Sequence, residues 1–408
     1  MFCRGCNKEL YHQFLDLGAS PPSNAYLNDK SVNLPELFYP LRVLVCDACW
    51  LVQTEDYALP EDLFNKDYAY LSSTSSSWLE HCKEFANSII EELGLDSQSF
   101  VVEIAANDGY LLQYFKDKDI PCLGVEPTQG TAEIAKSKGI NIIQDFFSEN
   151  LAKEMRVVNG AADLIIANNV LAHVPNINDF VVGIKELLKE GGIASFEFPH
   201  LLNLLQENQF DTVYHEHFSY LSVVAINNIF SSNGLKITRI EELRTHGGSL
   251  RVMAQRLSFD EAKVEPSVQK FIDLEINAGL TSIDSYLKFQ DKAIEIKNEF
   301  VKFLITAYGQ NKKVVAYGAA AKGNTLINFA GIRPDLISFV IDRSEFKIGK
   351  WMPGSRIPIL EEKWIDSVRP DYILILPWNI KKEVMSQLSR TREWGCKFVT
   401  AIPNIEVQ

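Results

Sequence analysis

Long apolar runs and an excess of basic residues are both missing from this chain of 408 residues, and no leader is expected. Its apolar runs fall far short of the roughly 20 residues that a membrane-spanning helix needs. The first residues contain no apolar stretch of the kind found in signal peptides. Lys and Arg number 40 against 53 Asp and Glu, a net charge of −13, which argues against the basic face of a nucleic-acid binder. We therefore expect a cytoplasmic protein with no membrane, nucleic-acid or obligate protein partner.

Cysteine is scarce, and four of the seven cysteines form two C-x2-C pairs. Disulfides are not expected in a reducing compartment, whereas two such pairs supply the four thiolates of a tetrahedral zinc site. Because four cysteine ligands leave no open coordination position, the zinc is predicted to be structural rather than catalytic. Four reduced thiols without a metal are the alternative. The expected ligands are Cys3, Cys6, Cys46 and Cys49.

The chain also lacks the G-x-G-x-x-G loop of dinucleotide-binding domains. The loop that follows the apolar stretch 100–104 contains one glycine and an acidic residue, Asp108, beside the predicted helix start. Glu126 lies 23 positions after Glu103, at the end of the next predicted strand, where an acidic residue bonds the ribose hydroxyls of an adenosine. An acidic loop repels a pyrophosphate but suits the sulfonium and ammonium groups of S-adenosylmethionine. These residues favour S-adenosylmethionine as cofactor, with NAD or a purely structural turn as alternatives.

Two further places are expected to meet this cofactor. Asp145 offers an acceptor, and the two phenylalanines after it offer an aromatic wall for adenine unless both rings belong to the core. A pair of asparagines ends another predicted strand, near the cofactor's amino-acid end. The full set of expected cofactor-binding residues is Glu103, Ala105, Asn107, Asp108, Gly109, Glu126, Pro127, Asp145, Phe146, Phe147, Asn168 and Asn169.

Strand and helix patterns alternate along most of the chain, which predicts an α/β fold with parallel, doubly wound sheets. A small cysteine-containing domain is expected at 1–66, a Rossmann-like domain at 67–258 and a second Rossmann-like domain at 259–408. The expected strands are 100–104, 121–125, 162–167, 192–198, 313–317, 336–341 and 372–376, with helices at 78–93 and 178–189, helix starts near 110 and 323, and a long helical stretch at 264–309.

Longer motifs follow in a fixed order and carry a family resemblance over essentially the whole chain. They are the two cysteine pairs, DLG at 16–18, EIAANDG at 103–109, NNVLAHVP at 168–175, EFPH at 197–200, YHEHFSY at 214–220, THGGSLR at 245–251, YGAAAKGNT at 317–325 and PWN at 377–379. The sequence resembles the S-adenosylmethionine-dependent C-methyltransferases of nucleotide-linked deoxysugars, in particular the 3-C-methyltransferases of branched antibiotic sugars such as tetronitrose. The resemblance implies a zinc-binding domain, a catalytic methyltransferase domain and a vestigial C-terminal copy of it. It also implies a sugar nucleotide bound between the last two.

Methylation of a carbon next to a ketone needs three groups. They are a base that removes the proton, a hydrogen-bond donor that stabilises the enolate oxygen, and a methyl sulfonium in line with the carbon. The cluster YHEH at 214–217 concentrates suitable groups. His217 is the expected base, because an imidazole titrates near neutral pH. Tyr214 is expected to bond the enolate oxygen or relay the proton, and Glu216 to orient a histidine or contact the sugar. The resemblance supports these three residues. His173, which follows a predicted sheet strand near the expected methyl donor, is the fourth expected active-site residue, with packing at a helix start as the alternative. A metal shared by His215 and His217 on one strand face is the alternative.

The sugar nucleotide is expected to touch both Rossmann-like domains. Lys322 stands between a predicted strand and helix, where a cation and free amides suit phosphates; an exposed lysine on a relic turn is the alternative. The loop at 246–247 could instead be a plain turn without substrate contact. Trp378 could instead serve only to pack the core. The expected substrate-binding residues are His246, Gly247, Lys322, Asn324, Trp378 and Asn379.

These observations predict an S-adenosylmethionine-dependent C-methyltransferase that acts at C3 of a nucleotide-linked 4-keto-6-deoxysugar, with dTDP as the expected nucleotide. Methylation at C5 and an NAD-dependent nucleotide-sugar-modifying enzyme are the enzymatic alternatives. A non-catalytic zinc scaffold is the third hypothesis, and it leaves the YHEH cluster unexplained.

Overall fold

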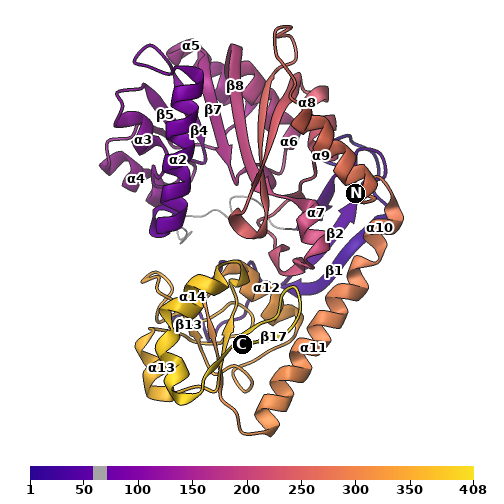
Figure 1. Ribbon diagram of the computed structural model, residues 1–408, viewed down its shortest axis with the longest axis vertical. Helices are drawn as coiled ribbons and strands as arrows, with labels where there is room; N and C mark the ends of the chain where they lie inside the picture. The colour runs from indigo at the N-terminus through magenta and orange to yellow at the C-terminus, as the bar shows by residue number, and fades with distance from the viewer. Residues whose placement is uncertain (58–70) are drawn as a thin grey trace.

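The computed structural model describes residues 1–57 and 71–408 (Figure 1). The expected domain boundary at 66/67 lies outside the described residues. Three sheets organise the chain: a four-stranded sheet near the N-terminus, a seven-stranded sheet in the middle and a six-stranded sheet at the C-terminal end. Of the helices described, none has the length and apolar character needed to cross a membrane.

The N-terminal sheet is antiparallel and takes its last strand from far along the chain. Its order is β1 (His12–Ser20), β2 (Tyr39–Val45), β3 (Val52–Thr54) and β9 (Ser219–Tyr220). Strand β9 follows the YHEH cluster directly, so the N-terminal sheet fixes the end of that segment. In Figure 1 this sheet lies between the two larger domains.

The middle sheet has the order β10-β11-β8-β7-β4-β5-β6. Five strands are parallel, and their side chains are largely buried because helices cover both faces. Helices α2, α3 and α4 pack on one face, and α5, α6, α8 and α9 pack on the other. The strands are β4 (Val101–Ile104), β5 (Cys122–Val125), β6 (Ile142–Ile143), β7 (Ala162–Asn168), β8 (Leu188–Pro199), β10 (Leu235–Leu243) and β11 (Ser249–Arg256). The helices are α2 (Ser76–Leu93), α3 (Leu112–Lys116), α4 (Gln129–Ser137), α5 (Glu149–Asn159), α6 (Ile177–Leu187), α7 (Leu201–Gln206) and α8 (Val223–Ser232).

The C-terminal sheet repeats the same strand order. Its sequence β14-β13-β12-β15-β16 matches β6-β5-β4-β7-β8, and each sheet continues into an antiparallel strand beyond the last of these. The expectation of a second Rossmann-like domain is confirmed. The strands are β12 (Val314–Tyr317), β13 (Val340–Ile341), β14 (Ile359–Leu360), β15 (Tyr372–Ile375), β16 (Lys397–Thr400) and β17 (Glu406–Val407), with helices α12 (Ala321–Phe329), α13 (Lys363–Val368) and α14 (Lys381–Gln387).

The long helical stretch is three helices rather than one: α9 (Pro266–Asn277), α10 (Ile283–Leu287) and α11 (Phe289–Gly309). Gly279 adopts φ +88° and ends the first helical run, a conformation that glycine reaches without steric cost. Helix α9 packs on β10 and α8, whereas α11 contacts β1 and runs down to the C-terminal domain in Figure 1.

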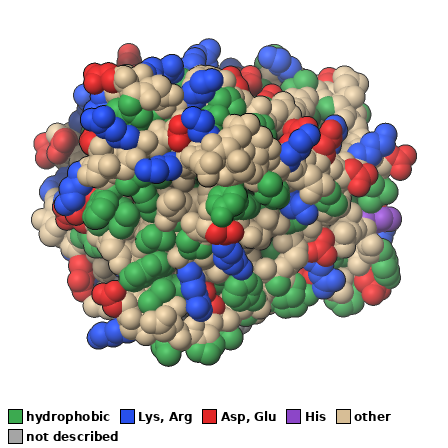
Figure 2. All heavy atoms as spheres, turned by 90° about the horizontal axis from the view of Figure 1, so that it is seen from below, with side chains coloured by type: hydrophobic (Ala, Val, Ile, Leu, Met, Phe, Trp, Pro, Cys, Tyr) green, Lys and Arg blue, Asp and Glu red, His purple; other side chains and the backbone are tan. Residues whose placement is uncertain are grey.

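Two other expectations shift at their ends. The strand expected at 336–341 is reduced to Val340–Ile341, because the amide of Ile337 bonds back to the carbonyl of Arg333 in a turn. The helix start expected near 110 falls at Leu112. Figure 2 shows the molecule from below, where basic and acidic side chains are interspersed with apolar ones over that face.

Candidate active site and zinc centre

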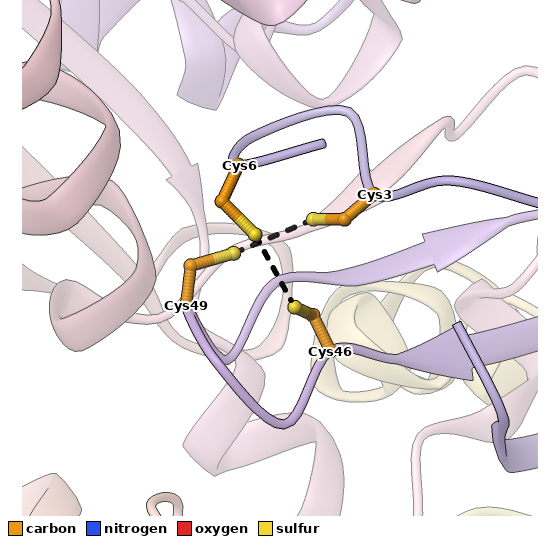
Figure 3. Close-up of side chains that lie close together, drawn as sticks. All are labelled: Cys3, Cys6, Cys46 and Cys49. Carbon is orange, nitrogen blue, oxygen red and sulfur yellow. Dashed lines mark hydrogen bonds between the residues drawn. The ribbon is translucent and has the colours of Figure 1, made fainter. Parts of the chain in front are cut away.

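The four paired cysteines converge on one point, with their sulfurs turned toward one another (Figure 3). The two pairs form knuckles of the same shape. In each, the residue after the second cysteine has a positive φ, +59° at Asn7 and +65° at Trp50. Its amide donates to the carbonyl of the first cysteine, at 2.9 Å for Cys3 and 3.1 Å for Cys46. Strands β1 and β2 bring the two knuckles together across 40 residues of chain.

The sulfur positions fit a zinc ion. All four lie within 4.8 Å of one another, and a tetrahedral zinc with Zn–S bonds of about 2.3 Å holds its sulfurs about 3.8 Å apart. Four thiolates would close the coordination sphere, as a structural zinc requires. Within 1–57 and 71–408 this is the one cluster of three or more His, Cys, Asp or Glu ligands that suits a metal.

A tight turn at the carboxyl end of β4 builds the candidate cofactor edge. Ala105 and Asn107 adopt φ of +57° and +49°, a region that side chains other than glycine rarely enter. The turn is held by Glu126 at the end of β5. One carboxylate oxygen of Glu126 accepts the amide of Asn107 and the other accepts the amide of Thr128, both at 2.9 Å. The acidic side chain is therefore fixed where it was expected.

Two buried polar side chains beside this turn lack ordinary partners among the described residues. Glu103 is fully buried, and neither of its oxygens makes a hydrogen bond of normal geometry. Burial raises the pKa of Glu103 well above its ordinary value, and the nearby Tyr110 hydroxyl acts in the opposite direction. Asn168 at the end of β7 is 6% exposed, with both amide atoms unpartnered. Buried polar groups are normally satisfied, so this edge fits a polar ligand.

Other expected cofactor residues differ in whether they are paired within the chain, packed in the core or exposed. Asp108 turns toward α4, where its carboxylate lies 3.2 Å from the Lys138 ammonium, so the charge is matched within the chain. Phe147 packs edge-on against Phe180 at 5.4 Å and belongs to the core. Phe146 is 42% exposed and leaves its ring accessible. Asp145, Pro127 and Gly109 lie in the loops around the same edge.

The YHEH cluster lies in a turn that precedes β9, not on a strand. The amide of His217 bonds to the carbonyl of Tyr214 at 2.9 Å and closes the turn. His215 consequently faces the N-terminal sheet, where its Nε2 lies 3.3 Å and 3.2 Å from the carbonyls of Tyr39 and Pro40. The alternative of a metal held by His215 and His217 on one strand face is therefore wrong.

His217 lies among other ring systems. The Tyr214 ring is 4.0 Å away between centroids and the His173 ring 4.7 Å away. Nδ1 of His217 is 3.0 Å from the carbonyl oxygen of Thr212. Since a carbonyl only accepts, Nδ1 carries the proton and Nε2 keeps its lone pair. Burial lowers the pKa of His217 well below its ordinary value, followed by the effect of His173.

His173 and Glu216 are joined to this group. Nδ1 of His173 lies 2.6 Å from the backbone carbonyl of Glu216, and burial lowers the pKa of His173 to about 4. The Glu216 side chain is 1% exposed, and its Oε1 accepts a hydrogen bond from Asn24 of the N-terminal domain at 3.1 Å. Burial raises the pKa of Glu216.

The C-terminal domain reaches this site through Trp378 and Lys322. The Trp378 indole donates to Asp211 at 2.8 Å, and the Lys322 ammonium lies 4.3 Å over the Trp378 ring and donates to Asn379 at 2.9 Å. Lys322 is thus half-buried rather than exposed on a relic turn. A Cβ on Gly247 would lie 2.5 Å from the Trp378 ring, so glycine is what lets the two domains approach.

His246 and Asn324 occupy different surroundings from each other. His246 lies 3.4 Å from the Asn169 amide, on the cofactor edge, and its pKa is lowered to about 4 by burial and by Lys322. Asn324 instead donates to the carbonyl of Ser23 at 2.6 Å and is 1% exposed. Its side-chain nitrogen therefore joins two domains rather than pointing to a substrate.

Sequence reasoning missed Asp211, Asn24 and the pair Trp78–His81. The Trp78 ring stacks on His81 at 5.0 Å, and His81 lies 2.9 Å from Glu197 at the end of β8. The EFPH motif contains Glu197, so it could have indicated that a partner such as His81 lies near the end of β8. Asp211 stands three residues before the YHEH cluster and could have been added to that cluster as a further ionisable residue. No local sequence pattern marks Asn24.

This geometry combines an α/β sheet edge with unpartnered buried polar atoms among the described residues, a buried histidine of lowered pKa and a separate centre of four cysteines. Residues 78–240 match the family model of a methyltransferase domain, residues 3–64 that of a zinc-binding domain and residues 244–403 that of the C-methyltransferase C-terminal domain. The chain is 31% identical over 405 residues to C-methyltransferase NovU of Streptomyces niveus, a match covering 99% of this chain and 96% of that protein.

The chain therefore belongs to this family of C-methyltransferases, with S-adenosylmethionine as cofactor and the four cysteines as its zinc site. The choice between S-adenosylmethionine and NAD is decided for the former. Two solved structures are more distant. Magnesium protoporphyrin IX methyltransferase of Synechocystis is 15% identical over 44% of this chain and 82% of its own, with a TM-score of 0.35. A methyltransferase from Archaeoglobus fulgidus is 14% identical over 44% and 94%, with a TM-score of 0.36. At these TM-scores neither carries an argument about function.

Proposed function

We propose that the protein methylates a carbon next to the ketone of a nucleotide-linked 4-keto-6-deoxysugar, at C3 of a dTDP-linked sugar. The observation that carries the proposal is the state of His217. Its Nδ1 proton is bonded to the Thr212 carbonyl, and its pKa is held well below the ordinary value. His217 is therefore neutral at pH 7, with the Nε2 lone pair ready to take a proton from carbon.

The remaining groups follow from this assignment. Tyr214, whose ring is tilted against that of His217, donates a hydrogen bond to the enolate oxygen as the C–H electron pair moves onto the ketone. His173, whose ring lies against that of His217, and Glu216 orient Tyr214 and His217. S-adenosylmethionine supplies an electrophilic methyl group when bound. The residues expected to hold it are those of the edge formed by Glu103, Glu126, Asn168 and the turn 105–109.

The sugar nucleotide is assigned to the seam between the domains proposed at 67–258 and 259–408. Its expected contacts are His246, Gly247, Trp378 and Asn379, with Lys322 as the cation nearest to the phosphates. The relative NovU carries the name C-methyltransferase, which supports transfer to carbon.

The test is incubation with S-adenosylmethionine and a dTDP-4-keto-6-deoxysugar in heavy water, followed by mass spectrometry and NMR. A gain of one methyl group on C3 is the expected result, and a methyl group on C5 would select the other carbon. Deuterium at C3 without methylation would show base action on this sugar with transfer blocked. Methylation on oxygen or nitrogen alone would overturn the proposal.

A further inference from the structure

The segment that carries the expected base, 213–218, is held by side chains from both other domains. Thr325 of α12 donates to the carbonyl of Val213 at 2.8 Å. From the N-terminal domain, Thr54 donates to the carbonyl of His217 at 3.2 Å and Arg4 to that of Phe218 at 3.1 Å. These contacts hold the backbone of 213–218 in place. The orientation of its side chains depends on other contacts.

Asn24 contacts the one carboxylate of this segment. Both its backbone amide and its side-chain Nδ2 donate to Oε1 of Glu216, at 3.3 Å and 3.1 Å. The other oxygen, Oε2, is buried and has no hydrogen-bond partner among the described residues. A buried carboxylate is costly unless it is paired or hydrogen-bonded. Burial raises the pKa of Glu216, and the backbone amide of Glu216 itself, the two donors of Asn24 and the Ser23 backbone act in the opposite direction.

The turn that presents Asn24 is itself anchored. The Ala25 amide bonds to the carbonyl of Pro22 at 3.1 Å. The Asn324 side chain, from the C-terminal domain, donates to the carbonyl of Ser23 at 2.6 Å, and the Tyr26 hydroxyl donates to the carbonyl of Ala319 at 2.5 Å. Asn24 therefore reaches Glu216 from a turn that the C-terminal domain holds on both sides.

The ionisable groups that face Glu216 do not replace this role. The hydroxyls of Tyr26 and Tyr220 lie within its electrostatic influence, and burial raises the pKa of each, so both are neutral near pH 7. The Lys347 ammonium lies over the Tyr26 ring, 5.4 Å from its centroid, and 3.9 Å from the Asp342 carboxylate. His173 contacts the Glu216 backbone, and its pKa is lowered to about 4.

We propose that Asn24 is a positioning residue of the active site, which holds the Glu216 side chain in one orientation while Oε2 stays available as an acceptor. The proposal rests on the proposed function, because the carboxylate matters through the reaction at His217. It assigns the N-terminal domain a part in catalysis that is separate from zinc binding. Asn24 acts through Glu216 and touches no reacting atom.

The test compares Asn24→Ala and Asn24→Asp with the wild type and with the matched control Asn28→Ala, whose side chain accepts the amides of Lys30 and Ser31 within its own exposed turn. Loss of a hydrogen bond to a charged group predicts a roughly 10- to 100-fold fall in kcat for Asn24→Ala, with S-adenosylmethionine affinity unchanged by calorimetry. The acid limb of the kcat/KM profile moves to higher pH, because the lost donor raises the pKa of Glu216. Asn24→Asp moves it further, since a second negative charge adds to the effect. An unmoved limb would overturn the proposal.

A double-mutant cycle with Glu216→Gln separates positioning from general destabilisation. If Asn24 acts through the carboxylate, Asn24→Ala causes little further loss of kcat in the Glu216→Gln background. Equal losses in both backgrounds would overturn the proposal. The same four proteins are unfolded in urea, where coupled midpoint shifts are expected and additive shifts would count against the contact. If the wild type methylates no sugar, the proposed function fails, and the urea cycle still decides the Asn24–Glu216 coupling.

Discussion

The two Rossmann-like domains share a strand order and a turn held by an acidic residue, yet the edges beside these turns are occupied differently. In the middle domain, Glu126 accepts the amide of Asn107 at 2.9 Å. In the C-terminal domain, Asp342 at the end of β13 accepts the amide of Ala319 at 2.8 Å. Each acidic residue ends the second strand of its sheet and holds the turn after the first. The same backbone arrangement, a turn held by an acidic residue, is thus present twice.

What fills the two edges is different. In the C-terminal domain the Ala319 carbonyl accepts the Tyr26 hydroxyl at 2.5 Å and the Lys347 ammonium at 2.9 Å. In the middle domain Glu103 and Asn168 have unpartnered buried atoms within the described residues. One edge has been filled by the chain itself and the other still offers polar groups to a ligand. A shared strand order alone therefore does not make a binding site, because the side chains at the strand ends determine whether the edge can accept a ligand.

The strongest test of this contrast is removal of the base beside the open edge. His217→Asn keeps a similar shape but lacks an imidazole, so turnover is expected to fall by about 10²- to 10⁴-fold, with S-adenosylmethionine affinity near the wild-type value. Steady-state kinetics and calorimetry measure the two quantities. Turnover within a few-fold of wild type would mean that His217 is not the base.

The paired acidic residues test the edges directly. Glu126→Ala is expected to weaken S-adenosylmethionine binding by roughly 10- to 100-fold, because a charged acceptor for the ribose hydroxyls is lost. Asp342→Ala, at the equivalent position, is expected to leave that affinity unchanged. Calorimetric titration gives the S-adenosylmethionine dissociation constant of each variant relative to the wild type. Equal losses would show that the two edges are not distinguished as the contacts indicate.

Acid should affect the open edge and spare the filled one, because all seven histidines precede residue 247. Burial lowers the pKa of His173 and of His246 to about 4 and that of His217 well below 6.5. The unfolded chain, with ordinary histidines, therefore binds more protons below pH 6.5 than the folded one does. Stability from this source is complete above pH 6.5 and is lost as the pH falls toward 4.

Hydrogen exchange from pH 7 to 5, corrected for the intrinsic exchange rate, measures this difference by region. Amides around 168–173 and 214–220 are expected to lose protection before those of β12 and β15. Uniform loss across both domains would place the acid sensitivity elsewhere.

Local patterns predicted much of this molecule. The cysteine pairs and the YHEH cluster are each short enough to be read from neighbouring residues, and the alternation of strands and helices predicted both Rossmann-like sheets. His215 was misplaced because residues two apart share a face only on a strand, and this segment is a turn. Asn24 was invisible because its partner, Glu216, lies 192 residues away, and only the folded chain brings three domains to that point.

The smallest expected effect concerns the group that fills the C-terminal edge. Tyr26→Phe removes the hydroxyl but keeps the ring, and the Ala319 carbonyl retains the Lys347 ammonium as a donor. The loss of one hydrogen bond predicts a fall of about 1 kcal/mol in the free energy of unfolding, measured in urea, with no change in S-adenosylmethionine stoichiometry. Tyr11→Phe, whose ring is 69% exposed, is the matched control and should leave stability unchanged. A second binding event in the Tyr26→Phe protein would mean that the filled edge is still able to bind the cofactor, and that Tyr26 is what excludes it.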